Sequence, residues 1–380
     1  MDYRLDEEYL EMREMFREFA EKEVEPLAIE VDENHRFPVE TVEKMKEMGL
    51  LGIPFAEEVG GQGSDTLTYI LAVEELSRVC ATTGVILSAH TSLGAGAIEK
   101  YGNEEQKAKY LTPLASGEKL GAFGLTEPDA GTDAAGQKTV AVLDGDEYVL
   151  NGSKIFITNA GYADIYVIFA MTDKSQGTRG ISAFIVEKDT PGFSVGTIEK
   201  KLGIRGSSTG ELIFQDCRIP KENLLGQEGK GFKIAMGTLD GGRIGIAAQA
   251  LGIAQGALDR ATKYVKERKQ FGREIAKFQN TQFKLAEMEV EVQAARHLVY
   301  DAALAKDNGE NYTVKAAMAK LKAASVAVEV TRQAVQLHGG YGYSQEYQVE
   351  RMYRDAKITE IYEGTSEVMK MVISGALLAK

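Results

Sequence analysis

The spacing of apolar residues along this 380-residue chain changes twice. Up to about residue 116 the apolar residues recur every three or four positions, which is typical of amphipathic helices. From Gly121 to about Pro220 they gather into short runs separated by turn residues, which is typical of strands. After Gly226 the helical spacing returns. This order predicts an α+β protein with an N-terminal α-helical domain (1–120), a central β-domain (121–225) and a C-terminal α-helical domain (226–380).

The same periodicity predicts the individual elements. One apolar helix face is defined by Leu285, Met288, Val292, Ala295, Val299 and Ala302, which alternate three- and four-residue steps. Helices are predicted over residues 7–31, 39–48, 66–77, 231–267, 313–336 and 365–379. Strands are predicted over residues 138–143, 147–150, 153–157, 165–171, 180–186 and 212–214, with turns at Asp144-Gly145 and Asn151-Gly152.

Composition and charge argue against several classes of protein. Fifty-seven acidic residues against 44 basic ones give a net charge of −13, and a nucleic-acid binder needs a basic surface. No apolar run approaches the roughly 18 residues of a membrane span, and the acidic N-terminus is unlike a signal peptide. Cys80 and Cys217 are too few for a disulfide framework, and the four histidines lack metal-ligand spacing. We therefore expect a cytoplasmic protein with no metal site and with neither a nucleic-acid nor a membrane partner.

Three well-known motifs are missing from the sequence. Gly229-Lys230 is not a phosphate loop, because Leu224 and Gly231 stand where that loop needs a glycine and a hydroxyl residue. The glycines near residues 94 and 339 do not lie between a strand and a helix, as a dinucleotide-binding fingerprint requires. No Gly-x-Ser-x-Gly nucleophile elbow occurs.

Three other segments concentrate glycines, hydroxyls and charge. The first runs from Gly124 to Gly136 with the sequence GLTEPDAGTDAAG, and is either a polar loop or a set of donors facing a phosphate or a heteroaromatic ring. The second, QLHGGYGY from Gln336, is either a helix C-cap or a site of close ligand approach. The third, IYEGTSE from Ile361, contains a carboxylate and a glycine before a helix that Thr365 or Ser366 caps.

Together these segments resemble the acyl-CoA dehydrogenase family over essentially the whole chain. The first matches the family pattern Gly-Leu-(Ser/Thr)-Glu-x-x-x-Gly-(Ser/Thr)-Asp, the second the pattern Gln-x-x-Gly-Gly-x-Gly, and the third contains Tyr-Glu-Gly-Thr-Ser. Residues 239–245 and 356–364 bring the chain closer still to the bacterial short-chain (butyryl-CoA) members. The resemblance implies the helical, β, helical fold, FAD as cofactor, an acyl-CoA substrate, an electron-transferring flavoprotein as partner, and a homotetramer built as a dimer of dimers.

The resemblance also implies roles for single residues. Glu363 is the expected catalytic base, which removes the α-proton of the acyl-CoA while the β-hydrogen leaves as hydride to the flavin. Some relatives carry the base at the position that matches Gly242, where this chain has no side chain. The expected substrate-binding residues are Thr132, Asp240, Arg243 and Gly364.

The expected cofactor-binding residues fall into two groups. One group lies in the β-domain and before the last helix, and consists of Phe123, Leu125, Thr126, Thr132, Phe156, Ile157, Thr158, Thr365 and Glu367. The other is expected to reach the diphosphate and adenosine of FAD from a neighbouring subunit, and consists of Arg268, Gln279, Gln336, Gly339 and Gly340.

Two alternatives to a short-chain dehydrogenase stay open at this point. The same residues would serve an enoyl-CoA reductase (crotonyl-, acryloyl- or aryl-acryloyl-CoA) that works in reverse with a bifurcating flavoprotein. A second alternative, from a different functional class, is a non-catalytic relative that acts as a binding module.

Overall fold

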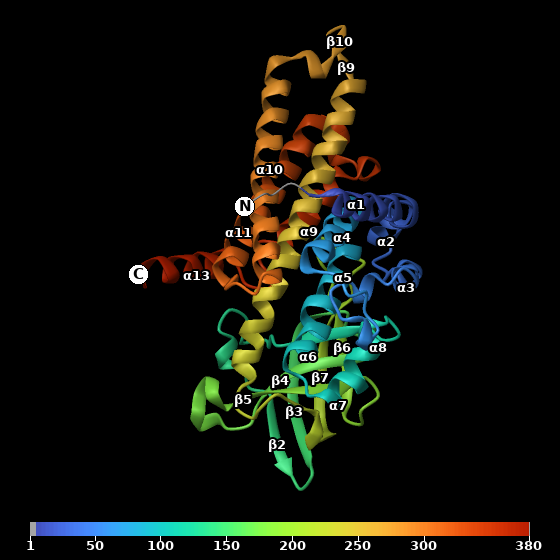
Figure 1. Ribbon diagram of the computed structural model, residues 1–380. Helices are drawn as coiled ribbons and strands as arrows, with labels where there is room; N and C mark the ends of the chain where they lie inside the picture. Colours follow the sequence, from blue (N-terminus) through green and yellow to red (C-terminus); the bar gives the residue numbers. More distant parts are fainter. Residues whose placement is uncertain (1–4, 380) are drawn as a thin grey trace.

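Helices, then a sheet, then helices follow one another along the chain in the computed structural model, which describes residues 5–379 (Figure 1). The predicted α+β class and its helical, β, helical order are therefore confirmed. In this part of the chain, no helix is long and apolar enough to cross a membrane. Cys80 and Cys217 are free thiols, and both are buried.

Short helices make up the first 116 residues. They are α1 (Glu7–Phe19), α2 (Ala28–Glu33), α3 (Val39–Glu47), α4 (Thr66–Val79), α5 (Ala81–Ser88), α6 (Gly96–Tyr101), α7 (Glu104–Gln106) and α8 (Thr112–Ala115), with a π-helical segment, η5 (Ala89–Ala95), between α5 and α6. The predicted single helix over residues 7–31 is wrong in its middle. A 3₁₀ turn at Glu25–Leu27 interrupts it, because Pro26 has no N–H for the helical hydrogen bond.

The central domain is built on one sheet. Its strands are β1 (Gly121–Gly124), β2 (Val140–Asp144), β3 (Glu147–Thr158), β4 (Ile165–Met171), β5 (Ile181–Glu187), β6 (Phe193–Ile198), β7 (Thr209–Pro220) and β8 (Leu224–Leu225). They lie in the order β6-β7-β3-β2-β4-β5-β8, and β1 pairs with β4. Every residue of β4 is buried, as its unbroken apolar run predicts for a central strand.

The predicted turn at Asn151-Gly152 is wrong. The chain continues there as the single strand β3, whose pairing with β7 shifts register between Leu150 and Gly152. A Cβ atom on Gly152 would lie 2.5 Å from the Thr139 hydroxyl oxygen. Gly152 therefore allows a close approach between neighbouring segments, while the extra residue of the β-bulge lies on β7, where Asp216 has a φ of 48°. The hairpin turn lies at Asp144-Gly145 as predicted.

Long helices form the last part of the chain. They are α9 (Gly231–Glu267), α10 (Gln279–Asp307), α11 (Thr313–His338), α12 (Val349–Ile358) and α13 (Ser366–Leu378); a small hairpin, β9 (Lys269–Gln270) and β10 (Arg273–Glu274), joins α9 to α10. In Figure 1, α13 extends away from the body of the molecule.

The N-terminal and C-terminal helices share one hydrophobic core, to which α4, α9 and α11 all contribute. The backbones of α4 and α9 touch, because Cβ atoms on Gly252 and Gly256 would lie 2.2 and 2.0 Å from the carbonyl oxygens of Glu74 and Arg78. The first turns of α9 pack against β5. This helix therefore connects the sheet to both sets of helices, and the candidate site lies where the three meet.

Candidate active site

A cavity of about 630 Å³ lies between the β-domain and the helices. Its size falls within the range of ligand-binding sites. The predicted site residues that line it are Phe123, Leu125, Thr126, Thr132, Phe156, Ile157, Thr158, Arg243, Glu363, Gly364 and Thr365. Apolar side chains of α5 and η5, at Val85, Ala89 and Leu93, line it as well. The structure thus brings together predicted site residues that lie up to 242 positions apart in the sequence, from Phe123 to Thr365.

One wall of the cavity is held by a buried ion pair that sequence analysis missed. Lys154 donates hydrogen bonds to Glu127 at 2.7 Å, to the Gln137 side chain at 3.1 Å and to the Leu125 carbonyl at 3.2 Å. Both charged side chains are buried, with 0% and 5% exposed. The Ile155 N–H donates to the Thr126 carbonyl at 2.9 Å. These bonds fasten the loop after β1 to the end of β3.

Glu127 is also hydrogen-bonded by the chain itself. Its carboxylate accepts the backbone N–H groups of Lys138 and Thr139. Burial acts to raise the pKa of Glu127, but the Lys154 charge and these hydrogen bonds outweigh it, so the pKa is lowered. Burial lowers the pKa of Lys154 to about 8, although its partner carboxylate opposes that change.

Glu363 lies in the opposite wall, in the loop between α12 and α13. Its backbone has a φ of 52° and that of Gly364 a φ of 104°, so two consecutive residues adopt left-handed conformations. Such a conformation is strained in a non-glycine residue. Thr365 ends the loop as the N-cap of α13, and the Ser366 N–H donates to the Glu360 carbonyl at 2.9 Å. Chain geometry thus turns the Glu363 side chain into the cavity.

The carboxylate of Glu363, unlike that of Glu127, accepts no hydrogen bond from the described chain. Its Oε2 atom is buried and has no hydrogen-bond partner within residues 5–379. Burial raises the pKa of Glu363 to about 7, and the charges of Lys320 and Arg243 oppose this rise. A carboxyl group with a pKa near neutrality can act as a general base at physiological pH.

Gly242 makes room for this carboxylate. A Cβ atom on Gly242 would lie 2.1 Å from Glu363 Oε2, far inside contact distance. Gly364 has a φ of 104°, which side-chain-bearing residues rarely adopt, and a Cβ atom there would lie 2.7 Å from the Met369 methyl group, which would have to shift.

Two basic side chains lie behind Glu363. Arg243 is buried and forms a salt bridge with Asp240, whose other oxygen accepts the Thr313 hydroxyl at 2.8 Å. Lys320 of α11 is fully buried and donates to the Gly364 carbonyl. Sequence analysis missed Lys320, although its place among the buried alanines of α11, such as Ala316 and Ala323, would have marked it as a cation on an apolar face.

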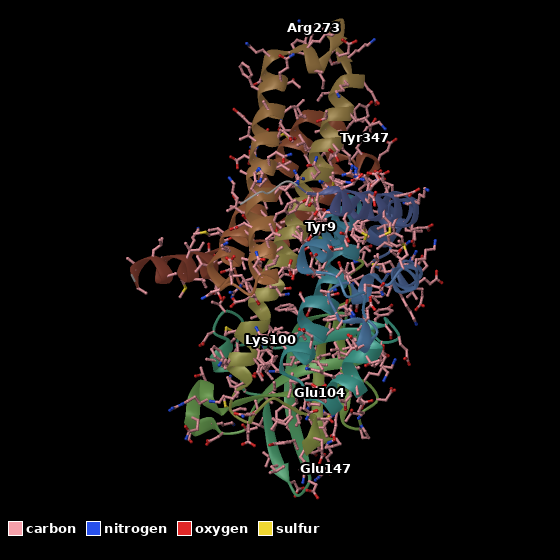
Figure 2. All side chains as sticks on the ribbon, viewed as in Figure 1. Tyr9, Lys100, Glu104, Glu147, Arg273 and Tyr347 are labelled. Atoms are coloured by element: carbon pink, nitrogen blue, oxygen red, sulfur yellow. The ribbon has the colours of Figure 1, made fainter. Side chains whose placement is uncertain are left out.

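The remaining predicted residues lie outside the cavity. Asp240 is engaged with Arg243 and Thr313, and Glu367 lines a neighbouring pocket together with Thr365. A further pocket, near the far end of α9, is lined by Arg268, Gln336, Gly339 and Gly340, and Gln279 is exposed at the first turn of α10. Figure 2 labels Arg273 in the adjoining hairpin at one end of the molecule and Glu147 of the β-domain at the other. Within one chain, this group does not join the cavity.

Comparisons with known proteins agree with this arrangement. Family models of the acyl-CoA dehydrogenase N-terminal, middle and C-terminal domains match residues 6–118, 122–217 and 229–378. The chain belongs to the acyl-CoA dehydrogenase family. Its members are flavoproteins, and the chain is an enzyme of this family.

Relatives with a stated activity cover the whole chain. A short-chain specific acyl-CoA dehydrogenase of Clostridium acetobutylicum is 65% identical over 99% of this chain and 100% of the relative. An acryloyl-CoA reductase (NADH) of Anaerotignum propionicum is 53% identical, over 100% of this chain and 97% of the relative.

Solved structures give the same result. The butyryl-CoA dehydrogenase of Megasphaera elsdenii superposes with a TM-score of 0.98 at 55% identity, covering 100% of both chains. A chain from work on the electron transferring flavoprotein of Acidaminococcus fermentans and flavin-based electron bifurcation superposes with a TM-score of 0.99 at 60% identity, again covering 100% of both.

Proposed function

We propose that this acyl-CoA dehydrogenase converts butyryl-CoA to crotonyl-CoA with FAD as its cofactor. The observation that carries the proposal is the Glu363 carboxylate, which lines the cavity with a buried, unpartnered oxygen and a pKa raised to about 7. The short-chain specific relative and the butyryl-CoA dehydrogenase structure support the choice of substrate.

The residues of the cavity fit a flavin. Within residues 5–379, no protein group forms a hydrogen bond with the hydroxyls of Thr126, Thr132 or Thr158, so these donors are free for a ligand. Phe156 is 59% exposed beside them and offers an aromatic face. When bound, FAD supplies the acceptor for the two electrons and the β-hydrogen of the substrate. We assign Phe123, Leu125, Ile157 and Thr365 to the same cofactor site. Glu367 is assigned to the cofactor from the neighbouring pocket, which Thr365 also lines.

Glu363 contributes to the reaction in two ways. Its carboxylate accepts the α-proton of the acyl-CoA, and entry of the substrate removes water and so favours this proton transfer. Its backbone N–H has no acceptor within the described residues and is available for the thioester oxygen, where negative charge develops as the proton leaves. Thr132, Arg243 and Gly364 of the cavity are proposed substrate contacts. Asp240 is proposed with them, through its salt bridge to Arg243.

The proposed assembly is a homotetramer. Support comes from α13, which extends from the body with Met371 and Leu378 exposed by 69% and 86%, and from the hairpin residue Phe271, exposed by 94% (Figure 1). In such an assembly Arg268, Gln279, Gln336, Gly339 and Gly340 would reach FAD in a neighbouring subunit. Replacing Arg268 with Ala should then lower the flavin content of the purified protein, and an unchanged flavin content would contradict this assignment.

An electron-transferring flavoprotein is the proposed electron acceptor, supported by the similar chain from Acidaminococcus fermentans. The acryloyl-CoA reductase relative favours a second candidate, in which the enzyme reduces an enoyl-CoA with electrons from such a flavoprotein. The proposed domain limits stay at residues 120 and 225, and the proposed location is the cytoplasm.

An anaerobic visible spectrum before and after addition of butyryl-CoA tests the main proposal. We expect a flavin band that bleaches. In the reductase, the flavin band would persist when butyryl-CoA is added. It would bleach when the reduced flavoprotein partner is added, and would return with crotonyl- or acryloyl-CoA. A colourless protein that cannot be reconstituted with FAD would contradict both and favour the binding module.

A further inference from the structure

Lys320 is a buried cation that touches the loop of the proposed base. Its side chain is fully buried, and its Nζ atom donates to the carbonyl of Gly364, the residue that follows Glu363. Within residues 5–379, no carboxylate lies within ion-pair distance of Lys320. Burying an unpaired ammonium group is costly, so a folded chain keeps one only where it serves a purpose.

The Gly364 carbonyl belongs to the strained part of the loop. Glu363 and Gly364 both have positive φ values, and such a turn persists only where its surroundings hold it. Besides the bond between Ser366 and Glu360, the loop is held by the Lys320 bond, by the Tyr362 hydroxyl bonded to Gln249, and by the Thr365 cap of α13. The Tyr362 and Lys320 bonds are at the two residues next to Glu363, and of these contacts the Lys320 bond is the one that brings a charge.

The charged and titratable groups around Glu363 come from several elements. Lys320 lies on α11 and Arg243 on α9, while Tyr69 of α4 and the adjoining Tyr362 are neutral phenols whose pKa burial raises. Arg243 already shares its charge with Asp240. Burial lowers the pKa of Lys320 to about 8, with the charges of Glu363, Glu360 and Glu367 opposing and that of Arg243 assisting, so Lys320 still carries a positive charge at pH 7.

We propose that Lys320 is a positioning residue for the base. Its hydrogen bond holds the 363–364 turn so that the carboxylate enters the space beside Gly242, and its charge favours the ionised carboxylate without a bond to it. The carboxylate thus keeps its lone pairs free for the substrate proton. This inference rests on the proposed function of Glu363.

Three substitutions separate the hydrogen bond of Lys320 from its charge. Lys320→Met removes both, and Lys320→Gln keeps a hydrogen-bond donor without the charge. Lys320→Arg keeps a donor and a positive charge on a group of different shape. Lys315→Met is the control, because Lys315 lies on the same helix with its side chain 29% exposed and pairs with Asp301 outside the cavity. The measurements are kcat and kcat/KM for butyryl-CoA against pH, with flavin content and Tm to confirm folding.

The expected results follow from the two roles. Lys320→Met should lower kcat about ten- to a hundredfold, because a catalytic group displaced by about 1 Å loses about a hundredfold in rate. The rising limb of kcat/KM should move to higher pH in both Lys320→Met and Lys320→Gln, because a carboxyl group that loses a nearby cation holds its proton more tightly. Lys320→Arg should restore much of the wild-type profile, and Lys315→Met should match the wild type.

An unmoved pH limb in a folded, flavin-containing Lys320→Gln protein would overturn the proposal. Should Lys320→Met fail to fold, Lys320→Gln still decides the question. Should the wild type not turn over butyryl-CoA, the function itself fails, and the role of Lys320 is then decided without substrate. Infrared titration of the protonated Glu363 carboxyl band, identified by its loss in Glu363→Gln, must show a higher midpoint in Lys320→Gln than in the wild type.

Discussion

Two buried lysines lie behind opposite walls of the cavity, and the carboxylates near them differ in their hydrogen bonds. On the β-domain side, Glu127 binds Lys154 at 2.7 Å and accepts two backbone N–H groups. On the helical side, Lys320 binds a carbonyl, and the Glu363 carboxylate keeps an oxygen with no partner in the described chain. Burial acts to raise the pKa of both acids, yet the pKa of Glu127 falls and that of Glu363 rises to about 7.

The difference shows what separates a structural carboxylate from a reactive one in the same fold. Hydrogen bonds to the charged form stabilise it and make it a poor proton acceptor. Where those bonds are withheld, burial keeps the proton affinity of the carboxylate high. We infer that the Glu127 pair serves to hold the loop and that Glu363 is left free for chemistry. Substitutions on the Glu363 side should therefore lower activity, and substitutions on the Glu127 side should lower stability.

The largest effect on activity is expected from Glu363→Gln. A general base contributes about 10² to 10⁴ in rate, so flavin reduction by butyryl-CoA should fall by at least that range. Stability should stay the same or rise, because the substitution removes a buried group that would otherwise ionise without a partner. Stopped-flow absorbance and thermal unfolding measure the two quantities. Rapid bleaching in this variant would contradict the assignment of the base.

Gly242→Ala should come next. Its new methyl group would lie 2.1 Å from the Glu363 Oε2 atom, so the carboxylate must move, and a displacement of about 1 Å costs about a hundredfold in rate. Gly241→Ala on the same helix is the matched comparison, since its methyl group would meet nothing closer than 3.9 Å. Equal rates in the two alanine variants would show that the space beside Gly242 does not matter.

On the other wall, Glu127→Gln should cost stability first. It leaves the Lys154 charge buried without a partner, and breaking such a pair costs about 3–5 kcal/mol. Chemical denaturation should show the loss of stability, and the purified variant should contain less flavin. In the protein that keeps its flavin, butyryl-CoA should still reduce that flavin. Glu104→Gln is the control, because the Glu104 side chain, labelled in Figure 2, is 92% exposed. Equal stability of the two variants would contradict a structural role for the Glu127 pair.

Local patterns predicted the elements well. The helix at 231–267 and the strand at 165–171 have the predicted bounds, because the spacing of their apolar residues agrees with the way they pack in the fold. The predicted turn at Asn151-Gly152 was wrong, because a glycine within a strand also serves where another segment, here Thr139, comes close to the backbone. Family patterns led to Glu363 and to most of the residues that line the cavity.

Other features depend on contacts between distant segments and left no local pattern. Lys154 and Lys320 are single lysines until folding places Glu127 and Gly364 beside them. The requirement for Gly242 arises only from where the Glu363 side chain lies, 121 positions later. Arg268 and Gln279 lie away from the cavity in one chain, so their predicted role depends on an assembly and stays a prediction.

Titration of both carboxylates in one protein tests the contrast most directly. Carbon-13 NMR of protein labelled at the glutamate side-chain carboxyl, with Glu363→Gln and Glu127→Gln to assign the signals, gives the two midpoints. We expect Glu363 to titrate near its pKa of about 7, so that the base is protonated and turnover falls as the pH drops through that value. Glu127 should stay ionised below its ordinary pKa of 4.5. Two carboxylates that both titrate near 4.5 would contradict the proposed division between a structural and a reactive glutamate.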